Sequence, residues 1–175
     1  MAVSNQATKQ SPGAPPSAPG ELADKVTKAI KSDKERAELH VRLNVEGGQH
    51  EERYEFRFDA SGGGEVECGL TCALSKRDLA PATSKITATD FAKLLKSVDI
   101  AKLAEAAKAV PRIPPDSLVG RLQVTDGRQE VTVIFMADPE QAKAAGYEPP
   151  PEVTQIVEGI YKQAAKQLGV RNARP

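Results

Sequence analysis

The sequence predicts an α+β domain in which an antiparallel sheet of about five strands carries helices on one face. Three observations lead to this fold class. Apolar and polar residues alternate in three segments within 37–74, a helical stripe follows at 91–98, and a hairpin pattern precedes a long amphipathic helix at 153–168. The expected order along the chain is therefore βββ-α-ββ-α, preceded by a disordered N-terminal tail.

The composition limits the classes of partner. The chain has 24 Lys and Arg against 24 Asp and Glu, and aromatic residues make up 4% with no Trp. It therefore lacks both the excess of cations that holds phosphate backbones or anionic membranes and the aromatic platforms on which bases stack. The start has no apolar signal sequence, and no run approaches the roughly 18 apolar residues of a membrane span. We expect a soluble, cytoplasmic protein that binds neither nucleic acid nor membranes.

The N-terminal part is expected to lie outside the folded domain. Residues 1–20 contain the run SPGAPPSAPG, which has little surface to bury and so predicts a disordered tail. Residues 21–34 carry a thin apolar stripe typical of a short helix or a linker. The single domain is expected over 35–169, with a short C-terminal tail at 170–175.

The first two predicted strands form a hairpin. Alternation begins at Arg36, and the pair Gly47-Gly48 suits a two-residue turn because glycine accepts positive φ values. This turn would place Val41 opposite Tyr54, with the aromatic residues of the second strand on the same face as the apolar residues of the first.

The third predicted strand, in the run VECGLTCAL, contains both cysteines of the chain. In a strand, Cys68 and Cys72 share one face with their Cα atoms about 13 Å apart, which is too far for a disulfide. We therefore expect two buried cysteines that act as small apolar residues. An alternative stays open, in which His50 and Glu52 join Cys72 in an open metal site, or a thiol-dependent function uses Cys68, Cys72 and His50.

A helical pattern follows these strands. The run SKRDLAPATSK is interpreted as a loop because it contains Pro81, and a capped helix with an apolar stripe from Phe91 to Val98 comes next. The apolar residues beyond Asp99 fall on another face of a straight helix, so a second short helix is expected to start there.

The second half of the chain predicts a hairpin and two more helices. An Asp-Gly dipeptide at Asp126 is a two-residue turn signal between two alternating segments. Asp138 and Pro139 then favour a short helix that Gly146 can close, and the long helix at 153–168 must cover a face of the sheet.

Three phrases in this half raise a resemblance: ITATDFAKLLKSVDIAKLA, VGRLQVTDGRQEVTVIF, and VTQIVEGI after Pro150. They describe a helix ending in an aspartate and an apolar residue, a hairpin turning on a glycine, and a C-terminal helix reached through prolines. From Ile86 onward the chain thereby resembles the emfourin family, small bacterial inhibitors of thermolysin-like metalloproteases. The resemblance implies an inhibitory function with a metalloprotease as the partner, and it assigns no inhibitory residues in this chain.

No motif in the sequence indicates catalysis or a cofactor. There is no nucleophile elbow, no phosphate-binding glycine motif before a helix and no histidine pair. We therefore expect a non-enzymatic module that binds a protein partner. Loops rich in Gly or Pro at 59–64 and 144–151 are either plain connectors or the binding surface. The candidate binding residues in them are Ser61, Gly62, Gly63, Tyr147 and Pro149.

Overall fold

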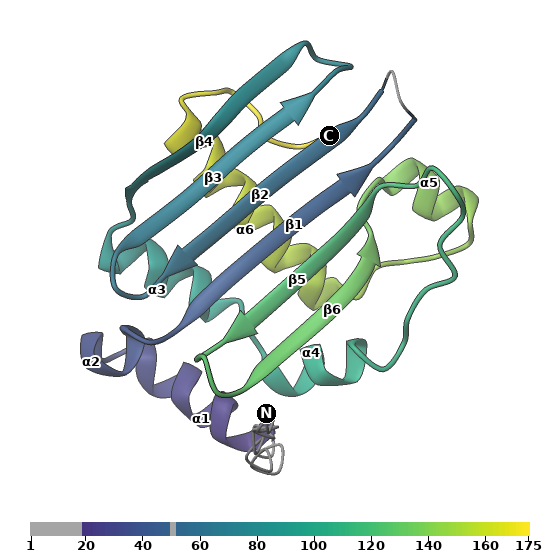
Figure 1. Cartoon of the computed structure of the whole chain (residues 1–175). Coiled ribbons are helices and arrows are strands. Elements are labelled where there is room, and N and C mark those ends of the chain that lie inside the picture. The colour runs from purple at the N-terminus through teal and green to yellow at the C-terminus, as the bar shows by residue number, and fades with distance from the viewer. Residues whose placement is uncertain (1–18, 50–51) are drawn as a thin grey trace, which may run out of the picture.

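The computed structural model describes residues 19–49 and 52–175, which form an α+β fold with a six-stranded antiparallel sheet (Figure 1). The strands are β1 His40–Gly47, β2 Tyr54–Ser61, β3 Glu65–Cys72, β4 Arg77–Lys85, β5 Val119–Thr125 and β6 Glu130–Met136. The helices are α1 Pro19–Ala29, α2 Asp33–Arg36, α3 Ala88–Lys96, α4 Ile100–Ala106, α5 Pro139–Ala144 and α6 Pro151–Leu168. The strand order across the sheet is β4-β3-β2-β1-β5-β6. Almost all of the expected N-terminal tail lies outside the described residues.

Within residues 19–49 and 52–175, helices cover one face of the sheet and none lies over the other (Figure 1), as predicted. Figure 1 shows α6 running across the back of the sheet, with α1, α3 and α4 on the same side. Apolar residues such as Leu43 and Phe58, which pair across β1 and β2, are buried beneath these helices. The open face carries polar groups, for example Arg42 and Asp59, whose Nε and Oδ2 atoms lie 2.7 Å apart. Alternation along the strands thus decides which side of each strand is core.

β4 is a strand where the sequence was interpreted as a loop, so the expected number of about five strands is wrong. It pairs antiparallel with β3, and the register shifts between Cys68 and Leu70. Pro81, which argued against a strand, lies beside this irregularity and packs closely against Gly69. Because Pro81 falls at this irregularity of an edge strand and has no partner residue in β3, its missing N–H is tolerated.

The register of the first hairpin also differs from the prediction. Tyr54 pairs with Gly47 and not with Val41. The connection between β1 and β2 is longer than the two-residue turn we expected, and it includes residues 50–51, which lie outside the described part. The shift is an even number of residues, so every side chain keeps its predicted face.

The capped helices follow the prediction. The side chain of Thr87 accepts a hydrogen bond from the N–H of Asp90 at the start of α3, and Asp99 caps α4 through the N–H of Lys102. Gly169 ends α6 in the left-handed conformation. Among the described helices, none is both long and apolar enough to cross a bilayer.

The core extends beyond the segment 35–169. Leu22, Val26 and Ala29 of α1 are at most 3% exposed and belong to the same apolar cluster as the sheet. Ala173, after the last helix, is also fully buried. α1 has few apolar residues, but Leu22, Val26 and Ala29 are all buried in the core.

Arg36, which was expected to begin the first strand, instead ends α2 and is 5% exposed. Its guanidinium donates to the carbonyls of Ala29 at 2.9 Å and Ile30 at 3.3 Å, at the C-terminal end of α1. It also donates to the carbonyl of Ala88 at 3.1 Å, in the first turn of α3. One cation therefore satisfies unpaired carbonyls at a helix end and joins α1 to α3.

Replacing Arg36 with Met should lower the free energy of unfolding by about 3 kcal/mol, because three carbonyls lose a charged donor in a buried place. Urea denaturation of the full chain measures this. The control is Arg42→Met on the open face, where a half-exposed ion pair contributes about 0 to 1 kcal/mol. Equal losses in the two variants would contradict the role assigned to Arg36.

Candidate functional site

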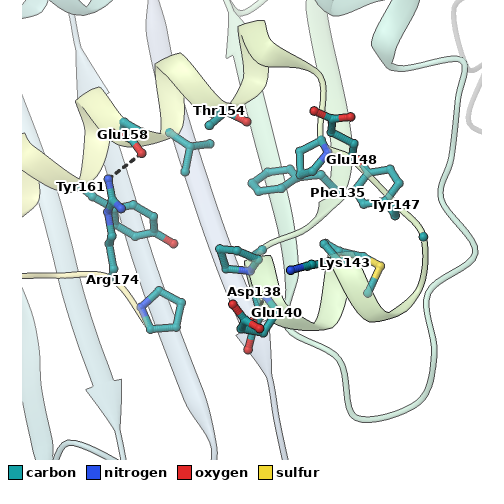
Figure 2. A pocket seen from close by; sticks show the side chains of 18 residues that line it. Phe135, Asp138, Glu140, Lys143, Tyr147, Glu148, Thr154, Glu158, Tyr161 and Arg174 are labelled. Carbon is teal, nitrogen blue, oxygen red and sulfur yellow. Dashed lines mark hydrogen bonds and ion pairs between the residues drawn. The ribbon is translucent and has the colours of Figure 1, made fainter.

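A cavity of about 810 Å³ lies beside the C-terminal end of β6, between α5, α6 and the segment that connects them (Figure 2). Its floor is largely apolar and aromatic and includes Phe135, Met136, Tyr147, Val157 and Tyr161. Its rim is charged and consists of Asp138, Glu140, Lys143, Glu148, Glu158 and Arg174. Figure 2 shows Tyr147 and Tyr161 on opposite sides of the cavity, with Phe135 between them.

Tyr147 is held in place by the way α5 ends. Gly146 adopts a positive φ of 67°, and its N–H donates to the carbonyl of Lys143 at 3.1 Å. The N–H of Tyr147 donates to the carbonyl of Ala142 at 2.9 Å, which completes a Schellman motif. Burial raises the pKa of the Tyr147 hydroxyl still further above neutral pH. The backbone of this aromatic residue is therefore fixed before any ligand arrives.

The segment that follows is stiff because it contains three consecutive prolines. Pro149 lines the cavity, Pro150 is extended with φ −53° and ψ 136°, and Pro151 is the first residue of α6. Proline fixes φ and suits the first position of a helix. The wall between α5 and α6 consequently has few conformations to lose on binding.

One face of α6 forms the opposite wall. Thr154, Val157 and Tyr161 are spaced by three and four residues, so they line the same side of the helix. Tyr161 is 6% exposed, and its ring lies 5.0 Å from that of Phe56 in a tilted arrangement. Burial raises the pKa of the Tyr161 hydroxyl well above its usual value.

The C-terminal segment, expected to be a tail, closes one side of the cavity. The hydroxyl of Tyr54 donates to the carbonyl of Ala173 at 2.6 Å. The guanidinium of Arg174 then forms an ion pair with Glu158 of α6, with 2.7 Å between Nη2 and Oε1. Figure 2 shows this pair at the edge of the site, beside Tyr161. These contacts join residues far apart in the sequence.

The rim of the cavity has an excess of negative charge. Arg174 is paired with Glu158, which leaves Lys143 as the remaining cation. Within the described part of the chain, Asp138, Glu140 and Glu148 form no ion pair. The rim thus carries three carboxylates without an ion-pair partner, of which Asp138 also caps α5 by accepting from the N–H groups of Glu140 and Gln141, against one ammonium group. This excess favours a ligand that carries a positive charge beside an apolar group.

The predicted binding residues fall into two separate places. Tyr147 and Pro149 line the cavity. Ser61 ends β2, and Gly62 and Gly63 follow it in the turn before β3, at the opposite end of the strands. The fold does not bring the two predicted loops together.

Gly62 has a clear role in packing. A Cβ atom added at this position would lie 1.8 Å from the carbonyl oxygen of Arg36. Its N–H donates to the carbonyl of Leu39 at 2.8 Å. A glycine is therefore required where the turn crosses the end of α2.

The two cysteines are free and buried, with Cys68 1% and Cys72 4% exposed. Burial raises the pKa of the Cys68 thiol, which disfavours the reactive thiolate. Of the alternative metal ligands, Glu52 is exposed and His50 lies outside the described residues. In the described ranges 19–49 and 52–175, no group of three or more His, Cys, Asp or Glu residues could hold a metal ion.

The sequence predicted the wall of the cavity that contains Tyr147 and Pro149, but not the wall formed by β6, α6 and the C-terminal segment. Tyr147 and Pro149 were predicted because they lie in a proline-rich loop. Phe135 and Tyr161 were recognised only as apolar residues of a strand and a helix, and Arg174 was placed in a tail. The missing side depends on contacts that no local pattern records.

Comparison with models of known protein families and with curated protein sequences finds no match to this chain.

Neither Cys68 nor Cys72 should react with Ellman's reagent in the native protein, and both should react after unfolding in guanidinium chloride. The reason is burial, which excludes the reagent and raises the pKa of Cys68. A variant with an added surface thiol, Ser75→Cys, is the matched control and should react at once. Rapid reaction of the native wild-type chain would favour a thiol-dependent function instead. Stoichiometric metal in the same sample would favour a metal site.

Proposed function

We propose that the protein is a non-enzymatic binding module that accepts an apolar side chain of a partner protein in the cavity between α5 and α6. A basic residue next to that side chain meets the carboxylates of the rim. The observation that carries the proposal is an aromatic floor beneath an acidic rim. One aromatic residue of that floor, Tyr147, is fixed by a Schellman motif and followed by a proline run. Rigid aromatic anchors in a pocket are the residues that contribute most at protein interfaces.

The size of the cavity supports this function. Ligand sites commonly enclose about 300 to 1,000 Å³ and combine apolar walls with a few polar groups. The volume of about 810 Å³ is large enough for a bulky side chain and its neighbours. The walls are mostly formed before binding, so less entropy is lost when the partner arrives.

The side chains that line the cavity also favour binding over catalysis. They include no histidine and no cysteine among the described residues. The hydroxyls of Tyr147 and Tyr161 are protonated at neutral pH, and burial moves their pKa still further from it. Acid and base chemistry near neutral pH works best with a group that titrates there. A partner that docks without reacting is the simpler use of this surface.

Panning a phage-displayed library of random peptides on the full chain tests the proposal. We expect peptides that combine an aromatic or aliphatic residue with Lys or Arg. Replacing Tyr147 with Ala should weaken a selected peptide about 30-fold, the effect of losing an interface anchor of about 2 kcal/mol. Affinity is measured by isothermal titration calorimetry.

Two variants serve as controls. Tyr147→Phe should retain affinity, since the ring is the anchor. Val110→Ala changes a residue that is 68% exposed and does not line the cavity, so affinity should stay the same. An unchanged affinity in Tyr147→Ala would rule the cavity out as the binding site.

A thermolysin-like metalloprotease is the first partner class to test, because the chain resembles the emfourin family from Ile86 onward. We expect the protein to slow hydrolysis of a fluorogenic peptide by thermolysin at equimolar concentrations, and Tyr147→Ala to weaken the inhibition. Full protease activity in excess protein would remove this partner class.

A further inference from the structure

The two edges of the sheet differ in how they are protected. β4 contains Pro81, begins and ends with a basic residue, and pairs irregularly with β3. Such features keep an edge strand from pairing with another chain. β6 pairs regularly with β5 along all 7 residues, contains no proline or lysine, and has Glu130 as its one charged residue. It presents a regular, unbulged edge of mostly β-branched and aromatic residues.

The main-chain N–H and C=O groups of alternate residues in β6 point away from β5. The N–H of Asp126 donates to the carbonyl of Gln129 at 3.2 Å and closes the hairpin, one residue later than the expected turn. In an antiparallel ladder, hydrogen-bonded and non-bonded pairs alternate from such a closing pair. Val133 therefore bonds to β5, whereas the N–H and C=O groups of Thr132 and Ile134 point outward.

These outward groups have no partner within residues 19–49 and 52–175. Besides the pairing with β5, no backbone or side-chain hydrogen bond involves the main chain of Thr132 or Ile134. The connection from α4 to β5 runs past this side of the sheet (Figure 1) and forms no backbone hydrogen bond with β6. Thr132 and Ile134 are both only half-buried.

This edge leads into the cavity. Phe135 and Met136, the last residues of β6, form part of its floor. A strand added beside β6 would place alternate side chains on the helix-covered side of the sheet, where the cavity opens. We propose that the partner segment binds as an extra antiparallel strand on β6 and inserts its apolar anchor into the cavity. This inference rests on the proposed function and adds the geometry of the bound partner.

Charge favours a foreign basic segment over a second copy of this chain. If two copies of β6 paired symmetrically about Val133, Glu130 of one would lie opposite Met136 of the other. That register would bring the carboxylate of Glu130 within two positions of Asp138, so a further negative charge would approach the unpaired carboxylates of the rim. β6 has no basic residue to offset them. A segment with Lys or Arg at this position removes the repulsion and adds attraction.

Amide hydrogen exchange with a library-selected peptide tests the geometry. In the free chain, the amides of Thr132 and Ile134 should exchange much faster than those of Val131 and Val133. Bound peptide should slow the exchange of Thr132 and Ile134 at least tenfold. Saturating peptide that leaves these two amides unprotected would overturn the added strand.

Substitution of Ile134 gives a second test. Ile134→Pro removes one outward N–H without touching the pairing with β5, just as Pro81 is accommodated on the other edge. We expect it to weaken the peptide about tenfold, while Ile134→Thr, which keeps the N–H, binds like the wild type. Wild-type affinity in Ile134→Pro would overturn the inference.

If Ile134→Pro fails to fold, the peptide is changed instead. N-methylation of residues that face β6 should abolish binding, and N-methylation of the alternate residues should not. Equal effects at both sets of positions would overturn the added strand.

The outcomes separate this inference from the proposed function. If Tyr147→Ala weakens the peptide and Ile134→Pro does not, the cavity binds the partner and the added strand is wrong. If neither variant matters, both proposals fail. A dimer in sedimentation analysis without peptide, with Thr132 and Ile134 already protected, would show that a second copy occupies the edge and would overturn the foreign segment.

Discussion

Burial of one face of the sheet is the constraint on which the rest of the structure depends. Because side chains alternate along each strand, covering one face with helices commits every second residue to the core. α6 supplies most of this cover across the middle of the sheet (Figure 1). Its first turn lies near β6, where α4 and the stiff segment from α5 complete the cover. The cavity forms where this segment meets the sheet, and it is a consequence of how the last helix is reached.

The same constraint explains which predictions held. The register of the first hairpin was wrong, yet the faces were right, because the shift was even and burial depends only on parity. β4 escaped prediction because Pro81 is a reliable signal against central strands and a weak one against edge strands. Whether a strand lies at an edge depends on the whole sheet, which no local window contains. Arg36 was misassigned for a similar reason, since its acceptors lie on α1 and α3.

In the candidate site, too, residues placed by local sequence signals were predicted, and residues placed by long-range contacts were not. Tyr147 and Pro149 were predictable because the Schellman motif and the proline run are local, with their signals in Gly146 and in the prolines themselves. The opposite wall depends on Tyr54 holding the carbonyl of Ala173 and on the ion pair of Arg174. The first contact joins the second strand to the end of the chain and the second joins the last helix to the segment after it, so sequence patterns could only describe their members as strand, helix and tail.

The edge of β6, to which no other part of the described chain pairs, and the acidic rim are best understood together. A flat edge strand carries a risk of pairing with any exposed strand, including its own copy. On this chain, Glu130 begins that strand and the carboxylates of the cavity surround its end. Antiparallel self-pairing would bring these like charges together, whereas a basic segment would neutralise them. The main chain of β6 could form hydrogen bonds with any extended segment, whatever its sequence. The negative charges of the rim therefore determine which segments bind, because they favour basic ones.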